Sequence, residues 1–440
     1  LSYAWANHTN LQPSMRTTRK LEPQLAPAFH AVEQSETPNP EELHATIRTL
    51  HLFEDAIAAR ASDIHLDSHG DEYCIRFRID GTLHDVAMVE LEEGIHFLRY
   101  FRTMAELGPP KPHVAQNGRI HMNIHGEPWE IRMSTAPAAL GDKVALRLLN
   151  RKQLEIHISD LGMSSETLQA IRNWTEDSTG MLVVAGPTGS GKTTTLYALL
   201  HELKMRQRSI VTIEDPVEYQ IEGITQIPVH EANGLSFAEG LKAMLRLDPD
   251  YLLVGEIRDR DSAGTAIDAA GAGRILLSTL HSRDAVGVIT MLRNYGIEDY
   301  EIASALEIVV AQRLVRRLCE KCKKLEPPTD AEKRWMDRLG MEYPKDCWHA
   351  TGCKDCSLTG FHGRLGVFEV WQLSEECDQS ILNHADELHL RKALLTHDHP
   401  ILLQDGLIKA AQGLTTLTEL QGMGASSQGY LLNYPHRTKM

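Results

Sequence analysis

The sequence predicts an α/β protein in which a larger part, built on a mostly parallel β-sheet, follows a smaller α+β part. Three patterns support this prediction. Residues alternate between apolar and polar along strand-like runs between 73 and 148, apolar strands alternate with helices beyond residue 180, and a glycine-rich loop joins a strand to a helix at 186–193. The 440 residues have room for two or three domains with substantial cores.

Composition limits the functional classes. A hydrophobic content of 42% with 24% charged residues is ordinary for a soluble globular protein. The net charge of -15 disfavours sequence-independent binding to nucleic acid, although a local basic channel stays possible. No apolar run approaches the ~20 residues of a membrane span, and the start shows no secretory signal pattern. We therefore expect a cytosolic protein that reaches a membrane only through a partner.

The first residues predict a tail and then a helix. Residues 1–40 hold five of the 19 prolines and show little periodicity, so they predict a tail or linker. From Glu41 the apolar residues recur at helical spacing, which predicts an amphipathic helix ending near Ala61. The recurring positions are Leu43, Ile47, Leu50, Phe53 and Ile57. This helix begins a predicted domain, 41–150.

Strands of period two fill the rest of that domain. Residues 73–79 alternate, and Asp80-Gly81 predicts a hairpin turn after them. Residues 120–133 repeat the pattern around a turn at His125-Gly126, and 144–148 predict a further strand. The alternation places Arg132 and Arg147 opposite the apolar face. From periodicity alone, a solvated sheet face is the simpler interpretation of these arginines. Residues 151–160 predict a linker.

The glycine-rich loop has the flanks of a phosphate-binding loop. An apolar run, 181–185, precedes Gly-Pro-Thr-Gly-Ser-Gly-Lys-Thr, and a helix-like segment follows. Its glycines allow successive N–H groups to face one anion, Lys192 is expected to reach the β- and γ-phosphates, and Thr193 to bind Mg²⁺. The alternative is a glycine-rich turn that happens to carry a lysine. The predicted ATP contacts are Gly186, Pro187, Thr188, Gly189, Ser190, Gly191, Lys192, Thr193 and Thr194.

Three further apolar strands deliver polar residues at their ends. Residues 210–213 lead to Glu214 and Asp215, 251–255 lead to Glu256 in a Walker B-like segment, and 275–279 lead towards His281. Ligands of open α/β sheets bind at the carboxyl ends of strands, so these side chains are catalytic candidates. The alternatives are that the acids cap a turn and that the histidine is structural.

Helices are predicted between these strands. A capping box at Ser236–Glu239 begins one helix, which carries Arg246, a further catalytic candidate, near its end. Helices are also predicted at 262–272 and 282–294, and an apolar stripe at 302–314. Near the end of the chain, 388–395 and 401–411 are helix candidates.

Four of the seven cysteines form two Cys-x-x-Cys pairs. Thirty residues separate Cys319 and Cys322 from Cys353 and Cys356, a spacing compatible with four thiolates on one ion. Sulfur ligation without a redox demand favours structural Zn²⁺, the alternative being reduced cysteines without metal. We interpret the other cysteines as packing residues, namely Cys74, Cys347 and Cys377.

Several motifs together resemble the type II secretion and type IV pilus assembly ATPase family. The resemblance is carried by Ile213–Glu218, Gly255–Asp259, Ser278–His281 and the phosphate loop, and it runs from Ser62–His65 to Gly363–Gly366, some 300 residues. Arg274 stands where members usually have histidine, and Leu247 replaces a common polar residue.

The resemblance implies a fold and a site. It implies a PAS-like domain, 41–150, before a RecA-like ATPase domain, 161–440, which includes a zinc subdomain, 319–366, and C-terminal helices, 375–420. Members form hexameric rings with ATP between the two domains. The implied catalytic residues are Glu214 as base or water-orienting acid, Glu256 of Walker B, Lys192, His281, Arg246, and Arg132 and Arg147 pointing at the nucleotide.

The resemblance also implies a function. The expected protein is a cytoplasmic homo-hexamer at the inner membrane that hydrolyses ATP to assemble a type IV pilus or a type II secretion pseudopilus. Its expected partners are an inner-membrane platform protein and a cytoplasmic recruitment protein, although the membrane-recruiting N-terminal domain of many members is expected to be short or missing here. Alternatives are a pilus retraction ATPase, whose members generally lack the cysteine pairs, a ring NTPase that translocates nucleic acid, and a scaffold without turnover.

Overall fold

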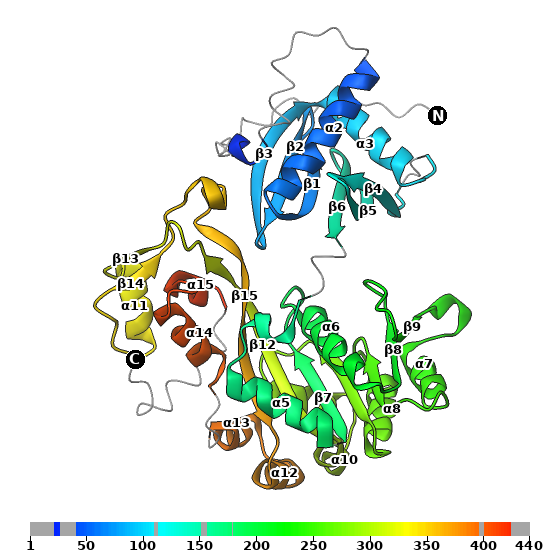
Figure 1. The fold of residues 1–440 in the computed structure, drawn as a ribbon, viewed down its shortest axis with the longest axis vertical. Helices are drawn as coiled ribbons and strands as arrows, with labels where there is room; N and C mark the ends of the chain where they lie inside the picture. Colours follow the sequence, from blue (N-terminus) through cyan, green and yellow to red (C-terminus); the bar gives the residue numbers. More distant parts are fainter. Residues whose placement is uncertain are drawn as a thin grey trace, which may run out of the picture. The chain divides into compact units, whose positions relative to one another are not determined.

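The computed structural model describes residues 22–26, 41–109, 113–150, 156–177, 179–395 and 400–423. The chain forms two compact units, residues 1–150 and 151–440 (Figure 1). Most of the predicted tail and half of the predicted linker lie outside the described residues. None of the helices in the described ranges is long and apolar enough to cross a membrane.

The first unit is one antiparallel sheet covered by two helices. Its strand order is β3-β2-β1-β6-β5-β4. The strands are β1 (Ala61–Ser68), β2 (Glu72–Ile79), β3 (Thr82–Glu90), β4 (Gln116–Ile124), β5 (Glu127–Ala138) and β6 (Gly141–Asn150). The helices α2 (Glu41–Ala58) and α3 (Leu91–Met104) pack on its apolar face through Phe53, Phe97 and Phe101. The predicted first helix is confirmed, and it ends at Ala58, three residues before Ala61, which begins β1.

Both predicted hairpin turns are present. Asp80 and Gly81 have φ of 49° and 90°, and His125 and Gly126 have φ of 53° and 81°. A two-residue turn with both φ values positive matches the twist of the strands it joins. Within the predicted tail, the 3₁₀ helix η1 (Pro23–Leu25) buries Leu25 in the core of this unit, which the absence of periodicity did not reveal.

The second unit is built on a seven-stranded sheet in the order β15-β12-β7-β11-β10-β8-β9. All neighbours are parallel except β12 and β15, which are antiparallel. The strands are β7 (Gly180–Ala185), β8 (Ile210–Glu214), β9 (Thr225–Pro228), β10 (Tyr251–Val254), β11 (Ile275–Leu280), β12 (Leu306–Leu318) and β15 (Phe361–Gln372). The predicted α/β class with a mostly parallel sheet is confirmed.

Helices cover both faces of this sheet. Along β7, Leu182 and Val184 pack with α5 (Ser165–Asp177) and α6 (Lys192–Leu203), whereas Met181 and Val183 face the opposite core. Figure 1 shows α5 and α6 together on one face. The opposite core includes α7 (Phe237–Met244), α8 (Arg260–Gly271), α9 (Val286–Asn294) and α10 (Asp299–Ala305). Sheet residues buried on both faces explain the nearly continuous apolar strands.

The structure defines the elements in two predicted segments. The apolar stripe at 302–314 spans two elements, the helix α10 and the strand β12, because a fully buried strand is apolar at every position and mimics helical spacing. The helix predicted from residue 282 begins at Val286, since Ser282 and Asp284 form a buried turn before it.

The cysteine segment follows β12. It contains β13 (Lys324–Glu326) paired with β14 (Cys347–His349), the helix α11 (Asp330–Arg338) and the short turn η5 (Lys354–Cys356). The C-terminal helices are α12 (Glu375–Leu382), α13 (Glu387–Leu395), α14 (Leu402–Ala411) and α15 (Leu417–Gln421). In Figure 1, α14 and α15 lie beside this segment.

Candidate functional site

The glycine-rich loop connects β7 to α6 as a tight turn over the end of the sheet. Gly191 has a φ of +90°, which residues with a Cβ rarely adopt. A Cβ on Gly186 would lie 2.3 Å from Oγ of Ser190 and 2.7 Å from the carbonyl oxygen of Gln312. Both glycines are therefore required by the backbone, and the loop ends at the amino end of α6, where N–H groups favour an anion.

A cleft of about 450 Å³ lies at this edge of the sheet. The carboxyl ends of β7, β11, β10 and β8 meet there because these strands run parallel and in register. The candidate residues that line it are Thr188, Gly189, Gly191, Lys192, Thr193, Thr194, Glu214, Glu256 and His281. Gly186, Pro187 and Ser190 belong to the loop but do not line the cleft, and Arg246 lies exposed beyond the end of α7, away from it.

Lys192 is held at the base of the cleft. Its Nζ donates to the carbonyl oxygens of Gly186 at 2.9 Å and Pro187 at 3.2 Å. Burial, with a smaller effect of Arg313, lowers the pKa of Lys192 to about 8. Neither carbonyl carries a charge, so an anion bound in the cleft would supply a counter-charge to Lys192.

His281 connects Lys192 to Glu256. Its Nδ1 lies 3.4 Å from Nζ of Lys192, and its Nε2 lies 3.3 Å from Oε2 of Glu256. Burial, followed by the charges of Lys192 and Arg258, lowers the pKa of His281. The imidazole is therefore mainly neutral at pH 7. In that state it can accept a hydrogen bond from Lys192 at Nδ1 and donate one to Glu256 from Nε2.

Arg258 joins the two acidic segments. It forms an ion pair with Glu256 and another, at 3.2 Å, with Oδ2 of Asp215. Its guanidinium also lies 5.2 Å from the ring centre of Phe237. The segments after β8 and β10 are thus tied together by one cation.

Glu214 is buried at the end of β8 and is oriented by three donors. Its carboxylate accepts hydrogen bonds from Tyr197, from Oγ1 of Thr212 at 2.5 Å and from Nε2 of Gln226 at 3.1 Å. Burial, and then the adjacent Glu214, raise the pKa of Tyr197, so its hydroxyl stays a donor. The carboxylate has a fixed orientation at the wall of the cleft.

Local sequence patterns did not reveal Tyr197, Leu314 and Arg364, which line this cleft. Tyr197 lies in α6 one turn after Lys192, and only its place on the helix face that points to β8 indicates its role. Leu314 and Arg364 line the cleft from β12 and β15, although these strands end more than a hundred residues after the loop. Arg258 follows Glu256 by two residues and was recognised only as part of a motif.

The first unit carries a row of charged residues across its sheet. Cross-strand pairing places Arg78 opposite Asp63, Asp63 opposite Arg147, Arg147 opposite Arg132, and Arg132 opposite Arg119. Nε of Arg147 lies 3.0 Å from Oδ1 of Asp63, while 63% of its side chain is exposed. Acidic neighbours offset part of this charge, since Arg147 pairs with Asp63, and Arg132 and Arg119 both lie within 4 Å of a carboxylate oxygen of Glu130.

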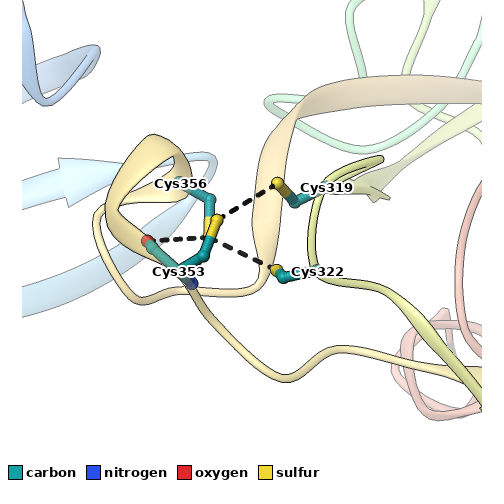
Figure 2. A group of neighbouring side chains, drawn as sticks. All are labelled: Cys319, Cys322, Cys353 and Cys356. Carbon is teal, nitrogen blue, oxygen red and sulfur yellow. Dashed lines mark hydrogen bonds between the residues drawn. The ribbon is translucent and has the colours of Figure 1, made fainter.

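The four paired cysteines form one cluster (Figure 2). Sγ–Sγ distances are 3.9 Å between Cys319 and Cys353, 3.8 Å between Cys322 and Cys356, and 3.8 Å between Cys353 and Cys356. All four are free thiols. Zn–S bonds of about 2.3 Å separate tetrahedral sulfur ligands by roughly 3.8 Å, so the cluster has the dimensions of a four-thiolate zinc site.

Backbone groups support this cluster. N–H groups of Cys353 and Gly360 each donate to Sγ of Cys356 at 3.2 Å. Burial alone would raise the pKa of Cys356, but these hydrogen bonds reverse that effect and hold it at about 7. Such N–H···S bonds stabilise thiolates around a metal.

The three remaining cysteines are buried. Cys377 accepts a hydrogen bond from Nε1 of Trp371 at 3.1 Å, and Cys74 lies within the first unit. Cys347 differs from them, because its Sγ lies 3.2 Å from Nε2 of His349 and 4.0 Å from a carboxylate oxygen of Glu332. The interpretation of Cys347 as a packing residue was therefore incomplete.

A glycine-rich loop at the amino end of a helix, with acidic and histidine side chains from three parallel strands beside it, defines a P-loop ATPase. Residues 41–422 match the family described as Type II/IV secretion system protein. The chain belongs to this family of secretion ATPases.

Individual relatives agree with the family. Type II secretion system ATPase E of Vibrio cholerae is 39% identical over 370 residues, which cover 84% of this chain and 73% of the relative. Type IV pilus assembly ATPase PilB of Myxococcus xanthus is 36% identical over 376 residues, covering 84% and 66%. The solved ATPase DotB of Yersinia pseudotuberculosis shares the fold, with a TM-score of 0.65 at 19% identity, covering 89% of this chain and 97% of that one.

Proposed function

We propose that this ATPase works as a homo-hexamer that powers assembly of a type IV pilus or a type II secretion pseudopilus through an inner-membrane platform protein. The observation that carries the proposal is the cleft in which Lys192, Glu256 and Glu214 meet at one sheet edge. The 36–39% identity to a pilus assembly ATPase and a type II secretion ATPase supports assembly as the process that ATP hydrolysis powers.

Each residue at the sheet edge has a proposed role in hydrolysis. Lys192 binds the β- and γ-phosphates, and the N–H groups of residues 186–194 bind the phosphate oxygens. Glu214, oriented by Tyr197 and Thr212, accepts a proton from the attacking water or orients it. Thr193 and Glu256 would hold Mg²⁺, which supplies positive charge against the negative charge that builds up on the phosphate during transfer.

His281 and Arg258 are proposed to respond to the phosphate. His281 lies between Lys192 and Glu256, so a change at either neighbour alters its hydrogen bonds. Arg258 pairs with Glu256 and Asp215, so movement of one acidic segment changes the ion pair with the other. This contact network offers a route from hydrolysis to the position of the strand-end segments.

The first unit is proposed to be PAS-like and to contribute Arg132 and Arg147 to the same nucleotide. Their cross-strand pairing beside Arg119 concentrates positive charge on the sheet face opposite its helices. Positive charge is needed because phosphoryl transfer spreads negative charge over the γ-phosphate oxygens. Arg246, exposed beyond α7, is a further proposed catalytic residue.

The Cys319, Cys322, Cys353 and Cys356 cluster is proposed to hold one structural Zn²⁺. It also favours assembly over retraction, since the retraction ATPases that the sequence resembles generally lack these pairs. A ring that translocates nucleic acid is a weaker alternative, given the net charge of -15. ATP turnover stimulated by DNA would support that alternative.

A trapping experiment tests the proposed function. Glu256→Gln should bind ATP without turning it over and accumulate on membranes with a polytopic platform protein and a cytoplasmic recruitment protein. Co-purified proteins would be identified by mass spectrometry, with Lys192→Ala, which cannot hold ATP, as the control. Recovery of nucleic acid alone would overturn the proposal.

A further inference from the structure

Three side chains with metal-binding atoms lie close together in space and come from the sequence between the two cysteine pairs. Glu332 comes from the first turn of α11, and Cys347 and His349 come from β14. Sγ of Cys347 lies 3.2 Å from Nε2 of His349, and Oε2 of Glu332 lies 4.0 Å from each of these atoms. This group, which we name the Glu-Cys-His cluster, shares no residue with the four-cysteine cluster.

Local structure fixes all three side chains. Cys347 and His349 are two residues apart on a strand, so they point to the same face of it. Pairing with β13 holds the strand, with Cys347 opposite Glu326 and His349 opposite Lys324. Glu332 is held by the N-terminal capping box of α11. Backbone pairing and helix capping therefore hold the three ligand atoms close together before any ion binds.

The separations suit a tetrahedral ion. With metal bonds of about 2.3 Å to sulfur and about 2.0–2.1 Å to nitrogen and oxygen, the ligand atoms would be roughly 3.4–3.6 Å apart. The observed 3.2–4.0 Å brackets these values. One thiolate, one imidazole and one carboxylate form a ligand set that favours Zn²⁺ among the common divalent ions. We propose that Glu332, Cys347 and His349 bind a second zinc-class ion, independently of the proposed ATPase mechanism.

The charge balance around Glu332 supports a cation. Its side chain is only 1% exposed, and its hydrogen-bond donors are the backbone N–H and Oγ1 of Thr329, both at 2.8 Å, and Oγ1 of Thr418 at 3.0 Å. Within the described ranges its sole ion-pair partner is His349. A buried carboxylate with mainly neutral partners is costly, and a bound cation removes that cost.

Thr329 and Thr418 would then orient the metal-bound carboxylate. Outer partners of this kind fix the direction of a ligand and are part of many metal sites. On binding, Cys347 would release its thiol proton to solvent and form one metal–sulfur bond, without any change in oxidation state.

A cavity of about 150 Å³ adjoins the cluster. Cys347 and Asp346 form part of its wall, and most of the rest is apolar, including Leu325, Trp348 and Leu407. Three protein ligands leave a fourth tetrahedral position for water or a small ligand, in contrast to the closed four-cysteine cluster.

Metal content tests the proposal. The full chain, purified from zinc-supplemented cells and gel-filtered without chelator, should carry two zinc ions per chain by elemental analysis. His349→Ala and Cys347→Ser should each carry one. The matched controls His389→Ala, an exposed histidine, and Cys377→Ser, a buried cysteine outside both clusters, should keep two.

Binding of a fluorescent ATP analogue shows whether each variant is folded. If Cys347→Ser fails to fold, His349→Ala decides the matter, because its side chain is already partly exposed. Cobalt bound in place of zinc gives a second readout, since loss of Cys347 removes one thiolate from the sulfur-to-cobalt absorption while the four-cysteine absorption persists. One zinc ion per chain in the wild type, or two in His349→Ala, would overturn the proposal.

Discussion

The nucleotide cleft and the four-cysteine cluster lie in the same unit, yet they are held together differently. The cleft is built on the ends of β7, β11, β10 and β8, whose residues are almost all buried. The cysteines lie in the turn just after β12 and at the short η5, where the chain is mostly irregular. A sheet holds its geometry by packing, whereas the irregular cysteine segment is expected to depend on the proposed zinc ion.

Because the two sites are held together differently, we expect substitutions in the cleft to affect catalysis and substitutions of the cysteines to affect stability. Changes to polar groups in the cleft should alter ATP turnover and leave the fold intact. Changes to the cysteines should weaken their segment and leave the cleft able to bind nucleotide.

The largest expected effect is loss of zinc in Cys353→Ser. Structural zinc contributes on the order of 10 kcal/mol to small zinc modules, so the cysteine segment should become labile to proteolysis. Limited proteolysis with mass spectrometry should locate the new cuts between β12 and β15. Affinity for an ATP analogue should change by less than about tenfold, or 1.4 kcal/mol. Equal loss of nucleotide binding would mean that the two sites are not separable.

The next effect is on catalysis. Glu214→Gln should lower kcat by about 10²–10⁴-fold, because it removes the proposed acid–base group while keeping nearly the same shape. Nucleotide affinity and the thermal midpoint should change little. Glu222→Gln, at an exposed glutamate in the same part of the chain, is the matched control. A Glu214→Gln protein with wild-type turnover would remove Glu214 from the mechanism.

A smaller effect is expected from Tyr197→Phe. It deletes one donor to the Glu214 carboxylate, and a hydrogen bond to a charged group contributes about 1.5–3 kcal/mol. We expect kcat to fall roughly tenfold, with KM nearly unchanged. Tyr300→Phe, at an exposed tyrosine, controls for the loss of a hydroxyl. An unchanged kcat would show that Thr212 and Gln226 orient the carboxylate without Tyr197.

The smallest effect is a pH dependence of binding. Burial lowers the pKa of Lys192 from its ordinary value of 10.5 to about 8. It is charged below pH 8 and loses its charge as the pH rises, so affinity for an ATP analogue should fall above pH 8, by at most about tenfold per unit. Lys192→Arg should bind more weakly but with a flatter profile, because arginine stays charged. A flat wild-type profile would contradict the lowered pKa.

The lowered pKa of Lys192 makes the free energy of unfolding rise with pH, whereas it makes ATP affinity fall. The unfolded chain holds the Lys192 proton up to about pH 10.5, whereas the folded chain releases it from about pH 8. Between these values the unfolded state binds more protons, so this group's contribution to the free energy of unfolding rises with pH.

Local patterns predicted most of the fold and of the phosphate loop. The turns at Asp80-Gly81 and His125-Gly126 need only two adjacent residues with positive φ, and the loop is one continuous segment. Local patterns could not predict which distant strands pair with one another. The row from Arg78 to Arg119 arises because β1 lies beside β6, and no local pattern specifies that neighbour.

The Glu-Cys-His cluster shows a second limit. Glu332 and Cys347 are 15 residues apart, and one of the ligands caps a helix, so no spacing resembles a known metal motif. The Cys-x-x-Cys pairs were recognisable because all four ligands lie in two short turns. The stripe at 302–314 could not be assigned to a helix or a strand for a different reason, namely that burial on both faces removes the alternation that identifies a strand.

Phosphate release from ATP by the purified wild type and by Lys192→Ala is the most direct test of the account. Lys192 is the cation at the base of the cleft, and loss of one such group costs about 10²–10³-fold in rate. The surface variant Lys242→Ala, whose side chain is 56% exposed, should keep the wild-type rate. We expect ATP turnover in the wild type and its loss in Lys192→Ala; equal rates in the two proteins would contradict the proposed ATPase site.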